Sequence, residues 1–285
     1  MSVIAKPDHT AIRVALWRAL HKEVDAKPLV LDDTLALELA DPESNWRERQ
    51  DMDVNFTKIF RASIVGRARF IEDLVLQTFS KQTSVQYVIL GAGLDSFALR
   101  HAQVLQNHKV FEIDTPAQQA WKQNRVAELE LTSPKNLIYV PVDFEKKEDW
   151  ILKLVDSGFQ LNKPAVVVST GVSMYLTKDA NMETLANLSR LAPGSIFAMT
   201  YLLPMEDADE EEKFGREVSE KGARSAGTPF ISFYREEDVI AMALEAGFSR
   251  AHVVKAKDLN ERYFSQRSDG LHATKSEEIL IAEIE

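Results

Sequence analysis

The segment Tyr87–Arg100, with the sequence YVILGAGLDSFALR, constrains the fold more than any other part of the chain. It begins with four apolar residues, a run typical of a parallel strand that is covered on both faces. The Gly-Ala-Gly turn at 91–93 lets the backbone bend sharply and lets a ligand approach closely. Asp95 or Ser96 is suited to cap a following helix. The pattern predicts a strand, a turn and a helix whose free N–H groups face a ligand site.

Strand-like and helix-like segments alternate from residue 85 to the end of the chain. Short apolar runs predict strands at 86–90, 109–113, 137–141, 165–169, 195–201, 249–254 and 279–284. The segments between them predict helices at 96–106, 115–130, 147–157, 178–191, 206–222 and 235–246. This alternation predicts an α/β fold with a doubly wound, mostly parallel seven-stranded sheet. The last strand follows a polar loop, which leaves an antiparallel orientation open for it.

The first 80 residues come before the first predicted strand and have helical patterns. Helices are predicted at 10–22, between Asp33 and Asp41, and at 55–79, with a polar loop at 44–53. We interpret residues 1–80 as a helical cap on a Rossmann-like core at 85–285, so that residues 1–285 form a single domain. An insertion at about 203–233 begins with acidic residues, which form either a solvated helix start or part of a lid.

Composition and charge exclude several classes of protein and site. The net charge of −10 argues against binding to nucleic acid and to anionic membranes, because both attract basic surfaces. The chain has no cysteine, which rules out disulfides, thiolate metal sites and a cysteine nucleophile, and no metal site is predicted. No apolar run is long enough to span a bilayer, and residues 1–8 lack the apolar core of a signal peptide. We therefore expect a soluble cytoplasmic protein.

The Gly-Ala-Gly turn by itself fits more than one kind of ligand. A dinucleotide-binding fingerprint needs a third glycine three residues after the second, and Ser96 occupies that position here. This difference weakens the hypothesis of a nicotinamide or flavin enzyme, which stays open as an alternative. A tight turn between strand and helix that binds no ligand is the other alternative.

An acidic pair ends the second predicted strand. Glu112 and Asp114 lie 21 and 23 residues after Gly91. A carboxylate at this place can accept hydrogen bonds from both hydroxyl groups of a ribose. We favour Asp114 because it is nearer the end of the strand, although Asp114 or Thr115 could instead cap the helix that starts at Pro116.

Two further strand ends carry polar or aromatic residues. Asp143 and Phe144 follow the third strand, where a carboxylate and an aromatic ring could hold an adenine or belong to a capped loop. The loop at 169–176 follows the fourth strand and is expected to face the reactive end of a ligand. Three such positions beside one glycine turn are more informative than any of them alone.

These motifs together resemble the leucine carboxyl methyltransferase family, in particular its bacterial branch of S-adenosylmethionine-dependent, polyketide-related O-methyltransferases. The glycine block of that family reads approximately LGAGLDTRAYR, and this chain has LGAGLDSFALR at 90–100. The family motifs EVDxP, VDF, EGVLMYL, RTRFIDD and ADGLRP are matched by EIDTP at 112–116, VDF at 142–144, TGVSMYL at 170–176, RARFIED at 67–73 and SDGLH at 268–272. A match to DTAxxVAxxRA at 9–19 extends the resemblance over nearly the whole chain.

The resemblance implies a class I methyltransferase fold and S-adenosyl-L-methionine as the cofactor. The glycine turn would bind the methionine part, Asp114 the ribose, and the pair after the third strand the adenine. Arg67 of the cap would pair with the cofactor carboxylate, for which a guanidinium is well suited. Thr170 stands where the family often has Glu, which places a side-chain contact to the cofactor amine in question. The cofactor residues implied are Arg67, Gly91, Ala92, Gly93, Asp114, Asp143, Phe144 and Thr170, and Tyr175 is the candidate catalytic residue near the acceptor, with core packing as its alternative.

The resulting hypothesis is direct methyl transfer to an oxygen of a small-molecule or peptide acceptor. Such a transfer depends on positioning the two reactants and on excluding water. A carboxylate acceptor needs no general base, whereas a hydroxyl acceptor benefits from one. Two alternatives stay open, namely a nicotinamide dinucleotide-binding oxidoreductase and a non-catalytic cofactor-binding protein, for which Thr170 is the only support. The oligomeric state is not indicated by the sequence.

Overall fold

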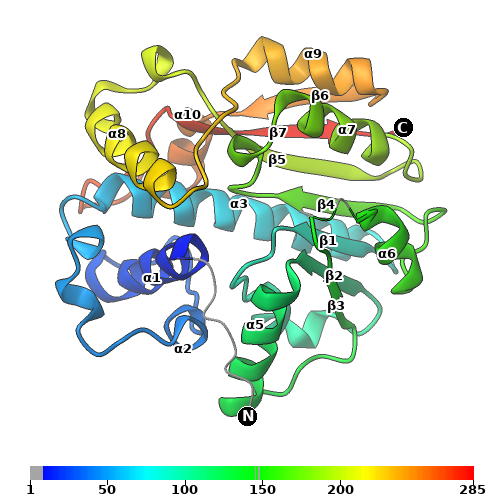
Figure 1. The fold of residues 1–285 in the computed structure, drawn as a ribbon, viewed down its shortest axis with the longest axis horizontal. Helices are drawn as coiled ribbons and strands as arrows, with labels where there is room; N and C mark the ends of the chain where they lie inside the picture. The colour runs from blue at the N-terminus through cyan, green and yellow to red at the C-terminus, as the bar shows by residue number, and fades with distance from the viewer. Residues whose placement is uncertain (1–8, 145, 147) are drawn as a thin grey trace.

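The computed structural model describes residues 9–144, 146 and 148–285, and its centre is a seven-stranded sheet with the order β3-β2-β1-β4-β5-β7-β6 (Figure 1). The strands are β1 (Gln86–Leu90), β2 (Lys109–Asp114), β3 (Leu137–Pro141), β4 (Ala165–Ser169), β5 (Ile196–Leu202), β6 (Arg250–Val254) and β7 (Glu277–Glu283). β1 to β5 pair in parallel, whereas β7 is antiparallel to both β5 and β6. This confirms the predicted mostly parallel sheet and shows that its last strand is antiparallel.

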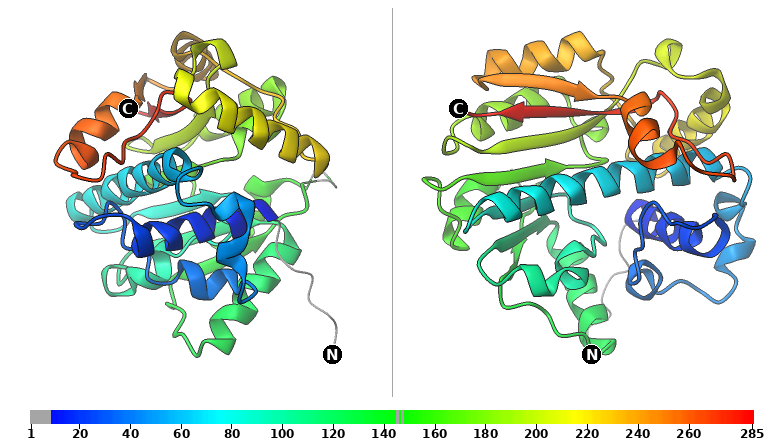
Figure 2. Two further views of the ribbon diagram at one scale, coloured as in Figure 1. Left: turned by 90° about the vertical axis from the view of Figure 1, so that its left-hand side faces the viewer. Right: turned by 180° about the vertical axis from the view of Figure 1, so that it is seen from behind.

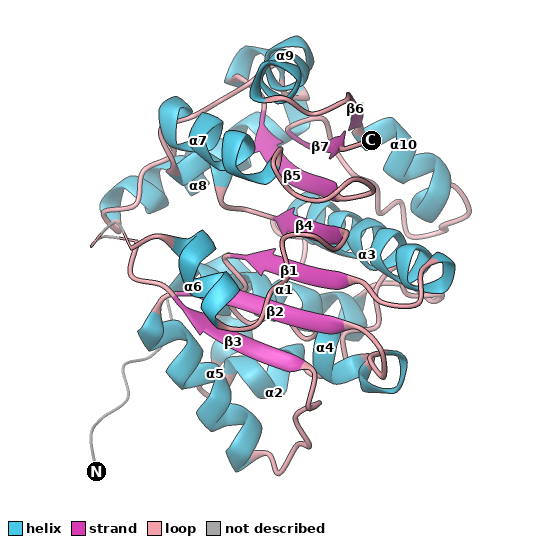
Figure 3. Ribbon diagram, turned by 90° about the vertical axis from the view of Figure 1, so that its right-hand side faces the viewer, coloured by secondary structure: helices cyan, strands magenta, loops and turns pink. Residues whose placement is uncertain are grey.

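The central strands are buried on both faces because their sequences are almost entirely apolar. Every residue of β1 (QYVIL) and β4 (AVVVS) is buried. Tyr87 and Ile89 of β1 join one core with α3 (Lys58–Lys81), and Val88 and Leu90 join a second core with α7 (Lys178–Leu188) and α9 (Glu236–Ala246). Figure 3 shows the strands edge to edge with helices on both sides, as expected of a doubly wound fold.

The helices α1 (His9–Val24) and α2 (Ala36–Ala40) lie with the first half of α3 beside the sheet (Figures 1 and 2). Their shared core contains Trp17 of α1, together with Trp46, Met52 and Leu94. The segment 44–53 was predicted to be a polar loop, but it forms two 3-10 turns. These turns bury its two large apolar side chains, Trp46 and Met52. Since Leu94 directly follows the glycine turn, the N-terminal helices are packed against the turn itself.

Two other segments differ from the prediction. The helix predicted at 96–106 is split into α4 (Phe97–Arg100) and a 3-10 turn at Ala102–Val104, because His101 has non-helical dihedral angles of φ −107° and ψ 24°. The polar loop predicted before β7 contains α10 (Ala256–Leu259), which continues as a π-helical turn at Asn260–Phe264. Phe264 packs on Gly66 of α3, where an added Cβ would lie 3.1 Å from the ring. Close packing on α3 therefore stabilises a helix that the local sequence only weakly indicates.

The segment 203–233 contains α8 (Glu210–Ser225), which lies on one side of α3 while α1 lies on the other (Figures 1 and 2). The exposed residues of α8 include Phe214 and Val218, whereas Glu212 and Arg216 are buried. A surface helix normally buries its apolar side chains and exposes its charged ones, whereas α8 shows the opposite pattern. Polar side chains of α8 therefore face an internal space. The remaining helices are α5 (Pro116–Glu128) and α6 (Trp150–Asp156). Among the described residues, no helix has both the length and the apolar character needed to cross a membrane.

Candidate functional site

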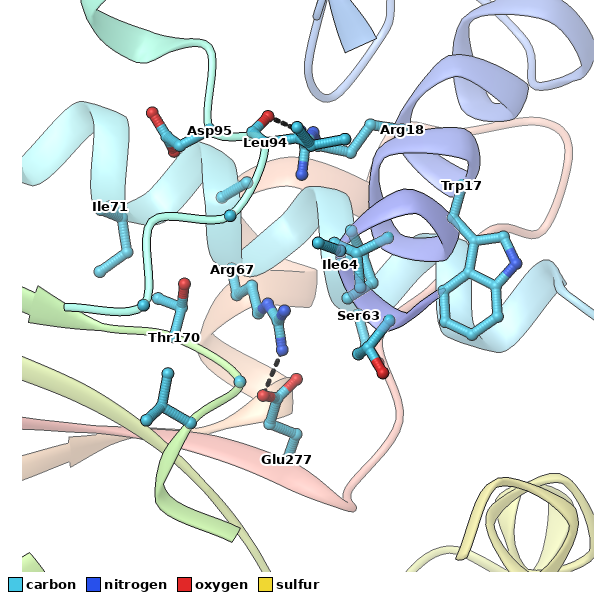
Figure 4. A pocket seen from close by; sticks show the side chains of 18 of the residues that line it. Trp17, Arg18, Ser63, Ile64, Arg67, Ile71, Leu94, Asp95, Thr170 and Glu277 are labelled. Carbon is cyan, nitrogen blue, oxygen red and sulfur yellow. Dashed lines mark hydrogen bonds and ion pairs between the residues drawn. The ribbon is translucent and has the colours of Figure 1, made fainter. Parts of the chain in front are cut away.

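A cavity of about 380 Å³ lies at the carboxyl ends of β1, β2 and β4 (Figure 4). We call the turn at 91–93, Asp114 and the turn at 170–171 the floor of this cavity. We call the side chains that α1, α3 and α8 contribute its roof. Because the floor comes from the sheet and the roof from the surrounding helices, the two parts are built in different ways.

The floor requires glycine at residue 91. Gly91 has a φ of +71°, and an added Cβ would lie 2.6 Å from Cγ2 of Val172. The backbone N–H groups of Gly91 and Ala92 both donate to the carbonyl of Ile113, at 2.9 and 3.1 Å. The turn is thus held between the end of β2 and the loop after β4, with no space for a side chain at residue 91.

Asp114 is fixed to the floor by backbone donors. Its Oδ2 accepts from the N–H of Gly93 at 2.6 Å, and its Oδ1 accepts from the N–H of Thr115 at 2.7 Å. The cap of α5 is Thr115, whose side chain accepts from the N–H of Gln118, so Asp114 is not the helix cap. The carboxylate therefore lies at the cavity with a defined orientation.

Arg67 is part of the roof, not of the molecular surface. Its Nη1 donates to Oε1 of Glu277 at the start of β7, and the two side chains are only 12% and 10% exposed (Figure 4). Arg67 also lies against Gly171, which has a φ of +70° and where an added Cβ would be 3.1 Å from Nη2. Glycine at 171 therefore lets the guanidinium approach the backbone directly after Thr170.

Thr170 and Tyr175 both line the cavity, with Tyr175 on the short turn Ser173–Tyr175. The ring of Tyr175 packs edge to face on Phe230, with centroids 5.3 Å apart. The structure thus brings together Arg67, Gly91, Ala92, Gly93, Asp114, Thr170 and Tyr175.

The predicted adenine residues are placed elsewhere. Asp143 and Phe144 follow β3 and do not line the cavity. Asp143 forms an ion pair with Lys146 at 2.7 Å, and Phe144 is 46% exposed. β3 is the outermost strand beside β2, so its end lies farther from the glycine turn than the ends of β1, β2 and β4.

An ion-pair network supports the floor and was not predicted. Arg18 of α1 donates to Asp33 and to the carbonyl of Leu94, both at 2.7 Å. Arg100 forms ion pairs with Glu72 and with Asp33. Burial alone would raise the pKa of Asp33, but the two guanidinium groups lower it below its usual value. The network joins α1 and α3 to the segment after β1, and no local motif in the sequence reveals it.

Polar residues of α8 were also missed. Glu212 and Arg216 are four residues apart, so they share one face of α8, and both line the cavity. Burial raises the pKa of Glu212, which shares a short hydrogen bond with Thr274. Arg216 pairs with Glu220 at 3.1 Å. The i, i+4 spacing was a usable signal, but the acidic run beside it is typical of a solvated helix start. In the part of the chain that the structure describes, no group of three or more acidic or histidine side chains is arranged to hold a metal ion.

Comparison with known sequences identifies relatives that match most of the chain. The family model described as "Leucine carboxyl methyltransferase" matches residues 11–189. The protein named "Putative S-adenosyl-L-methionine-dependent methyltransferase YktD" from Bacillus subtilis is 30% identical, over 93% of this chain and 93% of its own. A protein from Mycolicibacterium paratuberculosis, "Putative S-adenosyl-L-methionine-dependent methyltransferase", is 32% identical over 71% of this chain and 68% of its own.

Two crystal structures share the fold over nearly the full length. A DUF574 family protein from Streptomyces avermitilis has a TM-score of 0.61 at 13% identity and covers 98% of each chain. A protein from Thermobifida fusca, described as "putative methyltransferase", has a TM-score of 0.60 at 17% identity and covers 98% of this chain and 96% of its own. These likenesses bear on the fold, and they agree with the predicted class I methyltransferase architecture. The family model and the Bacillus relative go further, and they establish that the chain belongs to the leucine carboxyl methyltransferase family.

Proposed function

We propose that this protein binds S-adenosyl-L-methionine in the cavity and transfers its methyl group to an oxygen of a small-molecule or peptide acceptor. The main observation in support is the combination of a tight glycine turn and an oriented carboxylate on one floor, with a buried guanidinium above them. The printed names of the relatives support the identity of the donor.

The residues at the cavity fit this cofactor. Asp114 accepts one hydrogen bond at each oxygen from the backbone, and a carboxylate oxygen can accept a second, so both ribose hydroxyl groups can be bound. The methionine chain would lie against the glycine turn, whose N–H groups already donate to Ile113 and Asp114. On this proposal Asp143 and Phe144 hold the adenine where the site continues past the cavity along β3.

Arg67 is proposed to bind the cofactor carboxylate. Glu277 holds Nη1, which fixes the plane of the guanidinium while Nη2 lies beside Gly171. A planar guanidinium can serve two carboxylates at once through different N–H groups. Thr170 is adjacent to Gly171 in the chain. It offers a hydroxyl group to the cofactor amine at the position where the family often has a glutamate.

The bound cofactor supplies an electrophilic methyl group on sulfur. The chain provides position and the exclusion of water, and both favour a displacement reaction. The helices α1 and α8 cover the cavity, and we propose that the segment 203–233 moves as a lid to admit the acceptor. Tyr175 is proposed to contact the acceptor, because its ring lines the cavity with that of Phe230.

The competing dinucleotide hypothesis is disfavoured by Ser96. Its side chain is buried and its Oγ accepts from Nε of Arg100 at 2.8 Å. In a dinucleotide site this position is a glycine that allows close packing of the helix. Here it is instead part of the ion-pair network that lies beside the glycine turn.

Calorimetric titration with S-adenosylhomocysteine and with NAD tests the proposal. We expect the homocysteine nucleoside to bind at low micromolar concentration and NAD not to bind. If only NAD binds, or if the nucleoside shows no heat at high micromolar concentration, the proposed cofactor is wrong. Transfer of a labelled methyl group to a panel of hydroxyl and carboxylate acceptors then separates an enzyme from a non-catalytic binding protein.

A further inference from the structure

One arginine of the roof differs from the others in its charge balance. Arginines that line the cavity and form ion pairs are Arg18, Arg67, Arg100 and Arg216. Arg13 of α1 also lines the cavity, yet within residues 9–144, 146 and 148–285 it forms no ion pair. Its Nε is buried and has no hydrogen-bond partner in this part of the chain. Arg13 therefore presents a positive charge that no described acidic side chain balances.

The surroundings of Arg13 are aromatic. Its guanidinium lies 5.6 Å from the ring centroid of Trp17, one helical turn along α1. Trp17 stacks on Phe60 of α3, with centroids 5.3 Å apart and planes inclined by 10°. The contact with Trp17 orients the guanidinium, but it does not use the N–H groups at its edge.

The position of Arg13 separates it from the proposed cofactor residues. Arg67 lies against Gly171 on the sheet side, whereas Arg13 belongs to the aromatic side formed by α1 and α3. A charged donor in a protein of net charge −10 is best matched by an anion of the ligand, since residues 9–144, 146 and 148–285 offer it no acidic partner. The rings beside it favour an apolar or aromatic body.

We propose that Arg13 binds a carboxylate on the methyl acceptor, and that the acceptor is an aromatic or similarly apolar acid whose body packs on Trp17 and Phe60. This inference rests on the proposed function, which identifies the cavity as the place where donor and acceptor meet. It assigns Arg13 as a specificity-determining residue for the acceptor, with no direct role toward the donor.

A pair of probes with the same ring system tests this assignment. We would titrate 1-naphthoate and 1-naphthamide into the full-length protein saturated with S-adenosylhomocysteine, and into the protein alone. The wild type is expected to bind the naphthoate about tenfold more tightly than the amide, with S-adenosylhomocysteine present or absent. Arg13→Gln should remove this preference by weakening only the naphthoate, and Arg13→Lys should restore part of it.

Arg47→Gln is the matched control, because Arg47 also lies over a tryptophan, Trp46, at 4.3 Å, but outside the cavity. It should leave both affinities unchanged, and thermal unfolding should show that all three variants are folded. The assignment is overturned if the wild type binds the two probes equally or not at all, or if Arg13→Gln leaves the naphthoate affinity intact. It is also overturned if S-adenosylhomocysteine displaces the naphthoate, because the anion would then occupy the donor site. Failure of the wild type to bind S-adenosylhomocysteine would instead contradict the proposed function, whatever the naphthoate does.

Discussion

The floor and the roof of the cavity are held together by contacts of very different range. In the floor, the N–H of Gly93 binds Asp114, which is 21 residues away on the neighbouring strand. In the roof, Arg67 pairs with Glu277 over 210 residues, and Arg18 reaches the carbonyl of Leu94 over 76 residues. The floor follows directly from strand register, whereas the roof needs several separately folded elements to meet. A substitution in the floor therefore acts on local strand geometry, whereas one in the roof acts on contacts between distant segments.

The largest expected effect comes from the pair that supports β2 below the floor. Glu112 and Lys122 are fully buried, with Nζ and Oε2 2.5 Å apart. Lys122→Met should lower the free energy of unfolding at pH 8 by about 4 kcal/mol, because it leaves the buried carboxylate of Glu112 without its ammonium partner. The double variant Glu112→Gln/Lys122→Met should recover most of the loss in urea unfolding. If the single variant is as stable as the wild type, the pair does not stabilise β2.

The same pair gives a pH dependence of definite sign. Burial raises the pKa of Glu112 to about 7, against the lowering effect of Lys122. In the unfolded chain this carboxyl group releases its proton at a lower pH than in the folded protein. Between the two pKa values, the free energy of unfolding therefore falls as the pH rises toward 7. Urea unfolding of the wild type between pH 5 and 8 should show this fall, and the double variant should show a flatter profile. If the stability of the wild type and of the double variant falls equally with pH, Glu112 is not the source of the pH dependence.

Gly91→Ala is expected to have the next largest effect and to break the floor itself. The substitution adds a clash with Val172 to the strain of a φ of +71°, and we expect it to lower the free energy of unfolding by about 3 kcal/mol. Gly227→Ala is the matched control, since its φ is +82° but nothing lies within 4 Å. That variant should lose only about 1 kcal/mol. Equal losses in thermal unfolding would show that the close contact with Val172 has no energetic role.

Asp114→Ala separates ligand binding from stability within the floor. The variant should stay folded but bind S-adenosylhomocysteine about 100-fold more weakly, because two charge-assisted hydrogen bonds to the ribose are lost. Asp143→Ala, tested in the same calorimetric titration, should reduce the affinity less, since Asp143 lies outside the cavity. An unchanged affinity of Asp114→Ala would contradict the ribose assignment.

The smallest effect is expected in the roof, at the contact between α8 and α3. A Cβ on Gly215 would lie 2.5 Å from the end of the Phe60 ring. Alanine normally stabilises a helix interior by about 1 kcal/mol over glycine, and Gly222→Ala, with open space around it, should show this gain. Gly215→Ala should lose the gain by displacing Phe60, while S-adenosylhomocysteine binding stays within about twofold. If both variants are equally stabilised, α8 does not rest on Phe60.

Much of the floor could be predicted because its signals are local. The apolar run before Gly91 and the acid that ends β2 each lie within one strand–turn unit, and the strands were predicted to within about two residues. Gly247 directly follows the helix predicted at 235–246, where glycine typically ends a helix, and it has a φ of +108°. The choice of Asp114 over Glu112 rested on strand position alone, and the structure places only Asp114 at the cavity.

Apart from Arg67, the roof could not be predicted because its residues gain their roles from distant partners. Nothing in the sequence around Glu277 indicates that it meets Arg67, and nothing around Arg13 indicates that no acid of the described residues pairs with it. The reversed burial of α8 is equally hidden, since Phe214 and Val218 have the spacing of a buried stripe yet are exposed. α10 was missed because its stability comes from packing against α3, although Asp258, whose carboxylate accepts from the N–H of Lys255, was a local signal.

The position of β7 has a consequence for the order in which the protein matures. β7 is the last strand of the sheet in chain order, yet it lies between β5 and β6 and begins at the residue that holds Arg67. A chain still on the ribosome has two unpaired strand edges, and these are prone to join other chains. It also lacks the ion pair that completes the roof. The cavity therefore gains its complete roof only once synthesis has passed β7.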